Sequence, residues 1–222
     1  MALLALIGLG AAYAVYNATK PEGTQVATDS TTTTTGELDS RCPPAEGTAE
    51  RTVAFTEPPP MCIDASKTYT ATVETDLGPF TIEFFADKAP QTVNNFVFLA
   101  RHRYYDDVPF HRVIPGFVVQ GGDGEKGDGT GGPGYNIADE LPEGGEYEIG
   151  SLAMANTSQP NTGGSQFFVI TGEQGVQLPP SYSLFGKVTE GMDIVKQIEA
   201  DGTPAGTPAT LHRIVKVTIT ES

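Results

Sequence analysis

The sequence is poor in the residues that metal centres and polyanion-binding surfaces use. Its 222 residues include no tryptophan, two cysteines, three histidines and 13 basic residues against 28 acidic ones. The three histidines form no cluster with metal-ligand spacing, so we expect no metal site. The formal net charge of -15 opposes binding to nucleic acid, which depends on basic residues neutralising phosphates, and docking on an anionic membrane surface.

Motifs of three common sites are either incomplete or in the wrong sequence context. Gly122, Gly124 and Gly127 satisfy the dinucleotide pattern G-x-G-x-x-G, but the stretch is acidic and no helix is predicted after it. Its acidic residues lack the spacing and the closing glutamate of a calcium loop. Residues 163–165 do not have the G-x-S-x-G order of a hydrolase nucleophile. We therefore interpret residues 121–132 as a solvated glycine-rich loop.

The N-terminus carries the longest apolar run, from Ala2 to Tyr16. It is shorter than the roughly 20 residues that span a bilayer, and no basic residues precede it as in a signal peptide. We interpret residues 1–19 as the remnant of a membrane anchor or export signal; the alternative is a buried core helix. The polar, threonine-rich residues 20–40 predict a flexible tether.

An anchor followed by a tether predicts a protein of the cell membrane, with one N-terminal anchor and an extracytoplasmic domain. The alternative is a secreted protein whose signal has been cleaved. In either case we expect the membrane to be contacted through the N-terminal segment alone.

Residues 41–66 form a proline-rich extension that contains both cysteines, Cys42 and Cys62. In an oxidising compartment, a disulfide that closes a loop of this size contributes about 3 kcal/mol of stability. We favour this disulfide because both residues lie in one weakly structured stretch without another partner. The alternative is two independent thiols.

The pattern of the body, residues 67–222, changes to alternating strands. The 26 glycines and 17 prolines indicate many turns and a β-rich protein. Two helices interrupt the strands, one beginning at Pro90 and one over residues 191–199. About eight strands with one helix early and one late favour a mainly β fold, a closed barrel with capped ends. The strand candidates behind this approximate count, nine short segments in all, cover residues 67–75, 79–86, 108–113, 116–120, 135–140, 150–155, 165–170, 182–188 and 211–220.

The segment "FHRVIPGFVVQGGD", residues 110–123, places Arg112 and Gln120 in a strand-like apolar run. A buried guanidinium without a partner is costly, because it loses its hydration without compensation. Arg112 therefore reaches solvent, contacts a carboxylate, or is available to a ligand.

Long segments of the chain resemble the cyclophilin family of peptidyl-prolyl cis-trans isomerases, of a bacterial membrane-anchored or exported kind. They are "FHRVIPGFVVQGGD", "GSLAMANTSQPNTGGSQFFVIT", "LFGKV", "GMDIV" and "IEFFADKAPQTVNNFVFLA". The resemblance covers residues 67–222. It implies a closed eight-stranded antiparallel barrel capped by two α-helices, with a proline-binding groove on its outer face.

The resemblance also implies the site residues. Arg112 falls on the catalytic arginine, and Gln120 on the glutamine beside it. The substrate-binding positions are Phe117 and Phe168 in the wall of the proline pocket, Val118 beside them, Leu178 in its floor, Ala155 and Asn156 on the strand that holds the substrate backbone, and Thr157, Gln166 and Tyr182 in the groove.

Four residues depart from the family pattern. Val118 stands at a frequent methionine, Thr157 at a small alanine and Tyr182 at a frequent histidine. Gln177, by a gapped alignment, replaces a tryptophan or phenylalanine. The last change weakens the expectation of cyclosporin binding and leaves the catalytic arginine untouched.

These residues predict an isomerase that rotates X-Pro bonds and assists the folding of exported proteins. The implied chemistry needs no covalent step, metal or cofactor. The expected partners are proline-containing polypeptides, and we expect a monomer. The alternative function is a proline-peptide binding module or chaperone without significant turnover.

Overall fold

All but one of the segments predicted from alternation pair into one antiparallel sheet in the computed structural model, which describes residues 39–222. Its nine strands follow the order β3-β9-β1-β2-β8-β6-β7-β5-β4. The strands are β1 (Tyr69–Thr75), β2 (Gly78–Phe84), β3 (Val108–Pro109), β4 (Arg112–Ile114), β5 (Val118–Gly121), β6 (Ser151–Met154), β7 (Phe167–Ile170), β8 (Leu184–Glu190) and β9 (Arg213–Glu221).

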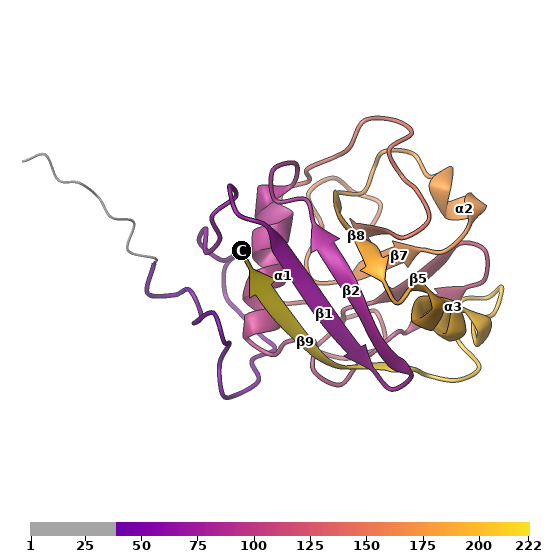
Figure 1. Cartoon of the computed structure of the whole chain (residues 1–222), viewed down its shortest axis with the longest axis horizontal. Coiled ribbons are helices and arrows are strands. Elements are labelled where there is room, and N and C mark those ends of the chain that lie inside the picture. The colour runs from indigo at the N-terminus through magenta and orange to yellow at the C-terminus, as the bar shows by residue number, and fades with distance from the viewer. Residues whose placement is uncertain (1–38) are drawn as a thin grey trace, which may run out of the picture. The chain divides into compact units, whose positions relative to one another are not determined.

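The sheet curls into half a barrel, with the long strands β9, β1 and β2 side by side (Figure 1). The mainly β, antiparallel class is confirmed. The closed eight-stranded barrel is not, because there are nine strands and β3 and β4 lie at the two ends of the strand order. Nine strands remain although residues 135–140 form none, because the predicted strand 108–113 divides into two. Its first part pairs with β9 and its second part with β5, so the chain changes partner at Phe110 and His111.

Two apolar clusters pack against alternate side chains of the same strands. In β7, Phe167 and Val169 lie in the main core, whereas Phe168 and Ile170 lie in a smaller second cluster. Val119 and Val118 of β5 are divided in the same way. Because side chains alternate along a strand, every second residue of β5 and β7 points away from the main core. These residues belong to the second cluster, which lies beside a surface pocket.

The part of the chain described contains three helices instead of the predicted two. Helices α1 (Pro90–Arg101) and α3 (Met192–Ala200) lie where periodicity placed them. The short α2 (Glu173–Val176) was not predicted, because four residues leave no periodic signal. The first turn of α1 is capped from a distance: the Glu140 carboxylate accepts hydrogen bonds from the backbone N–H groups of Gln91 and Thr92, at 3.0 and 2.8 Å.

Residues 135–140 were predicted to form a strand, and this prediction was wrong. They make a single bridge, in which the N–H of Ile137 donates to Gly163. The next N–H groups donate to side chains instead, Asp139 to Asn161 and Glu140 to Ser183. Side-chain acceptors therefore replace the ladder that a strand requires.

The extension contains the predicted disulfide between Cys42 and Cys62. Cys62 and Ile63 are buried in the main core, and Phe55 packs edge to face with His102. The Arg51 guanidinium donates to the carbonyls of Tyr104 and Gly124. The extension thus has no regular secondary structure and depends on the body for its core.

The predicted anchor (1–19) and nearly all of the predicted tether (20–40) lie outside the described residues. Across residues 39–222, no helix has the length and apolar character to cross a membrane.

Candidate active site

A pocket of about 300 Å³ opens on the outer face of the sheet. It lies where β4, β5 and β7 are paired with one another: Arg112 pairs with Gln120, and Gln120 with Phe168. We call it the proline pocket. Its lining residues are Arg112, Phe117, Val118, Gln120, Ala155, Asn156, Ser158, Phe168, Leu178 and Tyr182.

Arg112 reaches the pocket half-buried and hydrogen-bonded to a neutral group. Its Nη1 donates to Oε1 of Gln120 at 2.9 Å, and its Cζ lies 5.6 Å from the ring centroid of Phe117. Within residues 39–222 it forms no salt bridge. The guanidinium charge is therefore not neutralised by an acid in this part of the chain, and the remaining N–H groups can bind a ligand.

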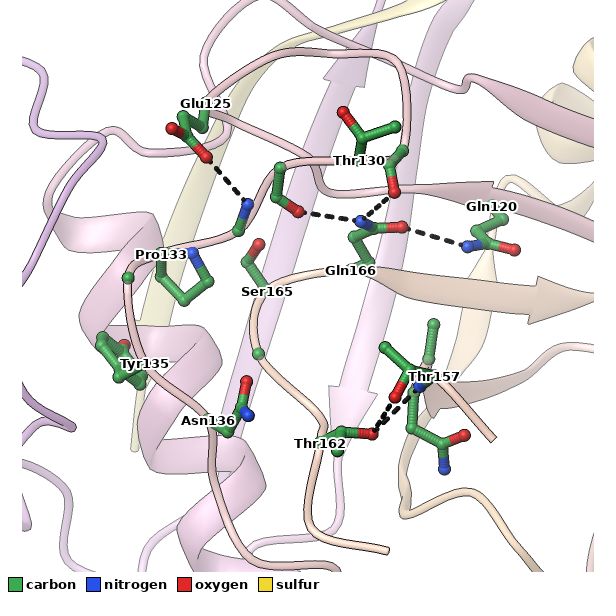
Figure 2. A pocket seen from close by; sticks show the side chains of 17 residues that line it. Gln120, Glu125, Thr130, Pro133, Tyr135, Asn136, Thr157, Thr162, Ser165 and Gln166 are labelled. Carbon is green, nitrogen blue, oxygen red and sulfur yellow. Dashed lines mark hydrogen bonds between the residues drawn. The ribbon is translucent and has the colours of Figure 1, made fainter. Parts of the chain in front are cut away.

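Gln120 is held by a second glutamine. Its Nε2 donates to Oε1 of Gln166 at 3.2 Å, and Nε2 of Gln166 donates to the carbonyls of Gly129 and Gly131 at 2.9 and 3.0 Å. Figure 2 shows Gln166 between the glycine-rich loop and Gln120. Each amide is oriented by the hydrogen bond to the next one. Because every Nε2 in this series donates away from Arg112, the oxygen of Gln120, and not its N–H, faces the guanidinium.

The glycine-rich loop closes around Asp123, which is 1% exposed. The carboxylate accepts hydrogen bonds from the N–H groups of Lys126, Gly129 and Gly131. Burial alone would raise the pKa of Asp123, but these bonds outweigh it and lower the pKa. A loop expected to be solvated is therefore ordered around a buried anion, which positions the carbonyls that Gln166 contacts.

Phe117 is placed by the turn between β4 and β5. Glu199 of α3 accepts a hydrogen bond from the N–H of Gly116 at 2.8 Å. Burial raises the pKa of Glu199, yet the hydrogen bonds from Lys196 and Gly116 lower it overall, so it remains an anion at neutral pH. Gly116 has a φ of 74°, a conformation that favours glycine.

The opposite wall is aromatic. The rings of Phe168 and Tyr182 meet edge to face, 5.3 Å apart. The backbone of Tyr182 is held by the hydroxyl of Tyr147, which donates to its carbonyl at 2.7 Å and accepts from its N–H at 3.1 Å. Burial raises the pKa of Tyr147 to about 12, so its hydroxyl keeps the proton that it donates.

Residues 155–158 form the rim. The side chain of Asn156 donates to the carbonyl of Ser181 at 2.8 Å, and its oxygen accepts from the N–H of Ser158 at 3.0 Å. In the described part of the chain, the backbone N–H and C=O of Asn156 have no hydrogen-bond partner. They can pair with an extended peptide.

A second pocket, of about 560 Å³, adjoins the first and shares Gln120, Ala155 and Asn156 with it. Gln166 and Thr157 line this second pocket (Figure 2). The hydroxyl and the N–H of Thr157 are both 3.0 Å from Oγ1 of Thr162.

The structure thus brings nine of the eleven predicted site residues into the proline pocket, and places the other two, Thr157 and Gln166, in the second. Ser158 was not predicted. Its left-handed backbone, with a φ of 62°, is seen in the structure and has no signal in the sequence. The supporting roles of Tyr147 and Glu199 were also missed, because each lies far along the sequence from the residue that it positions. Gln177 is exposed and does not line the proline pocket.

Comparison with known proteins agrees with this geometry. The family model of cyclophilin type peptidyl-prolyl cis-trans isomerases matches residues 70–220. Peptidyl-prolyl cis-trans isomerase CYP18-2 of Arabidopsis thaliana is 40% identical over 147 residues, which are 64% of this chain and 87% of that protein. Peptidyl-prolyl cis-trans isomerase B of Bacillus subtilis is 48% identical over 118 residues, 52% of this chain and 80% of the relative.

A crystal structure of a Cryptosporidium parvum cyclophilin type isomerase, solved in the presence of the dipeptide Ala-Pro, is also similar. Its TM-score is 0.63 at 32% identity, and the match covers 69% of this chain and 99% of that one. The chain therefore belongs to the cyclophilin family, and it is a peptidyl-prolyl cis-trans isomerase.

Proposed function

We propose that Arg112 is the catalytic residue and that proline-containing polypeptides bind with the proline ring in the proline pocket. One observation carries this assignment. A half-buried guanidinium is bonded to a neutral amide instead of a carboxylate, at the edge of an apolar pocket formed by Phe117, Val118 and Phe168. The Ala-Pro dipeptide present with the similar protein from Cryptosporidium parvum supports a ligand of this class.

The chemistry follows from the amide bond. Resonance gives the X-Pro C–N bond partial double character and a barrier of about 18–20 kcal/mol. In the twisted transition state this resonance is lost, and the proline nitrogen gains a localised lone pair. An N–H of Arg112 directed at that nitrogen stabilises the twisted state more than either planar isomer, and only such differential binding accelerates rotation.

The other residues bind the two sides of the X-Pro bond separately. Phe117, Phe168 and Leu178 would retain the proline ring, while the free backbone groups of Asn156 pair with the preceding part of the substrate. The acyl side then turns against a fixed ring. Gln120 fixes the fork of the guanidinium, so less side-chain entropy is lost when the transition state forms.

We further propose that the substrates are exported proteins and that the domain works outside the cytoplasmic membrane, tethered or secreted. The disulfide between Cys42 and Cys62 supports this, since disulfides persist in oxidising compartments. Membrane fractions washed in high salt would retain a tethered protein and lose a secreted one. Two reactive thiols in the protein isolated without reductant would contradict an oxidising compartment.

The competing function is a binding module that holds proline peptides without significant turnover. The test is NMR exchange between the cis and trans signals of a short X-Pro peptide at catalytic protein concentrations. We expect exchange with the native protein and little with Arg112→Ala. Chemical-shift changes without exchange would favour the module, and equal exchange rates for both proteins would refute the role of Arg112.

A further inference from the structure

A third pocket lies where the disulfide-bridged extension meets the body. Its volume is about 400 Å³, and its apolar lining residues are Pro58, Pro59 and Met61 from the extension and Ile137 and Ala138 from the body. No charged residue lines it. We call it the extension pocket, because three of its residues come from the extension and not from the part of the chain that matches the family model.

The extension pocket is built with a fixed wall. Asn94 of α1 holds the backbone on both sides of Met61: its Nδ2 donates to the carbonyl of Pro60 at 2.8 Å, and its Oδ1 accepts from the N–H of Cys62 at 2.7 Å. The disulfide joins Cys62 to Cys42. Three consecutive prolines restrict the backbone before this point. The wall is therefore ordered before any ligand binds, which reduces the entropy cost of binding.

Met61 nevertheless leaves 48% of its surface exposed, although it is a large apolar side chain. Methionine is flexible and polarisable, and it adapts to different apolar partners. Gln91 and Asn136 also line the pocket and are exposed, and their side-chain amides have no hydrogen-bond partner within residues 39–222. An apolar lining with free amides suits an uncharged side chain together with its backbone.

The second pocket adjoins both of the others. The proline pocket and the second pocket share Gln120, Ala155 and Asn156, and the second pocket shares Asn136 with the extension pocket. Gln120 and Asn136 lie on opposite sides of the second pocket in Figure 2. A polypeptide whose proline occupies the first pocket can therefore follow the surface to the third.

We propose that the extension pocket binds an apolar side chain of the same polypeptide whose proline is isomerised, at a position removed from the proline. This rests on the proposed function of the proline pocket. The contact is made equally in the planar and twisted states, so it lowers KM and leaves kcat unchanged. It gives this isomerase a preference for long, apolar, unfolded substrates that the catalytic groove alone does not supply.

The test uses peptides of about 20 residues in which one Ala-Pro lies in a Gly-Ser background and a single leucine is moved through the positions on either side. NMR exchange gives KM and kcat for each peptide. For the native protein, we expect leucine at one or two neighbouring positions to lower KM about tenfold relative to serine, corresponding to 1.4 kcal/mol. Lysine or aspartate there should give no gain, because the pocket offers no charged partner.

Two variants of the lining, Met61→Glu in the extension and Ala138→Glu in the body, should abolish the gain. Leu77→Glu is the matched control, since Leu77 is also an exposed apolar residue in a turn, 37% exposed, and lines none of the three pockets. It should keep the gain. All three variants should isomerise a tetrapeptide that fills only the proline pocket at the native rate.

The proposal is overturned if no leucine position changes KM, or if both lining variants respond as the native protein does. It is also overturned if sedimentation shows a dimer that Met61→Glu dissociates, because the pocket is then occupied by a second copy. Failure of the native protein to isomerise the tetrapeptide is a different result, which contradicts the function of the proline pocket itself.

Discussion

The amide chain behind Arg112 makes a quantitative prediction. Gln120→Leu removes the acceptor that lies 2.9 Å from the guanidinium, and Gln166→Leu removes the acceptor of Gln120, 3.2 Å away. If Gln166 acts on catalysis only by orienting Gln120, replacing both residues cannot lower kcat/KM more than replacing Gln120 alone.

The expected losses follow from these bonds. A hydrogen bond to a charged group contributes about 1.5–3 kcal/mol, and the half-exposed position of Arg112 favours the lower end, so Gln120→Leu should lower kcat/KM roughly tenfold. The neutral Gln120–Gln166 bond contributes about 1 kcal/mol, so Gln166→Leu should lower kcat/KM about fivefold. Independent effects would multiply to about fiftyfold, whereas we expect the double variant to stay near tenfold.

The assay is the exchange rate of a proline tetrapeptide by NMR, with the unfolding temperature measured for each variant. Thr130→Val is the matched control, because Thr130 lines the second pocket but is exposed, and its hydroxyl donates to Asp128 instead of to the amides. It should change kcat/KM less than twofold. A double variant near fiftyfold, or a Gln166→Leu variant with native activity, would refute the reasoning.

Two further predictions concern stability. Replacing both Cys42 and Cys62, which are 20 residues apart, by serine should lower the free energy of unfolding by about 3 kcal/mol in urea titrations. Nδ1 of His212 lies 2.9 Å from Oδ2 of Asp76, and its Nε2 lies 2.8 Å from Oδ2 of Asp201. Burial lowers its pKa, but the two carboxylates outweigh burial and raise it. Its contribution to stability is therefore complete below its ordinary pKa of 6.5 and is lost as the pH rises through the raised value.

The pH prediction is checked by comparing urea unfolding of the native protein and His212→Phe at pH 6 and pH 9. The free energy of unfolding of the native protein should exceed that of the variant by more at pH 6 than at pH 9. A difference that grows toward pH 9 would contradict a positively charged His212. For the disulfide, equal free energies of unfolding in the native protein and the serine variant would mean that the bridge does not constrain the unfolded chain.

The sequence predicted most strands, the two longer helices and the disulfide, because each has a local or compositional signal. It could not assign the faces of β7. Phe167 and Phe168 are both buried, and only the packing of two clusters decides that Phe168 lines the pocket. The site residues came from the family resemblance and not from periodicity.

Two other failures have the same physical origin. Residues 135–140 alternate like a strand, but their N–H groups donate to the distant side chains of Asn161 and Ser183. Asp123 was interpreted as part of a solvated loop, whereas it is buried and accepts three backbone hydrogen bonds. Hydrogen bonds between backbone N–H groups and side-chain oxygens leave no periodic trace in the sequence.

The most direct test of the central claim separates substrate binding from turnover in Arg112→Lys. This variant keeps the charge and loses the planar fork that Gln120 orients. NMR titration with a proline tetrapeptide gives Kd, and exchange of its cis and trans signals gives kcat. We predict a Kd within about threefold of the native value and a kcat lowered by about tenfold or more, as expected for an interaction made in the transition state. A native kcat in this variant, or a loss confined to Kd, would contradict the claim that the guanidinium stabilises the twisted bond.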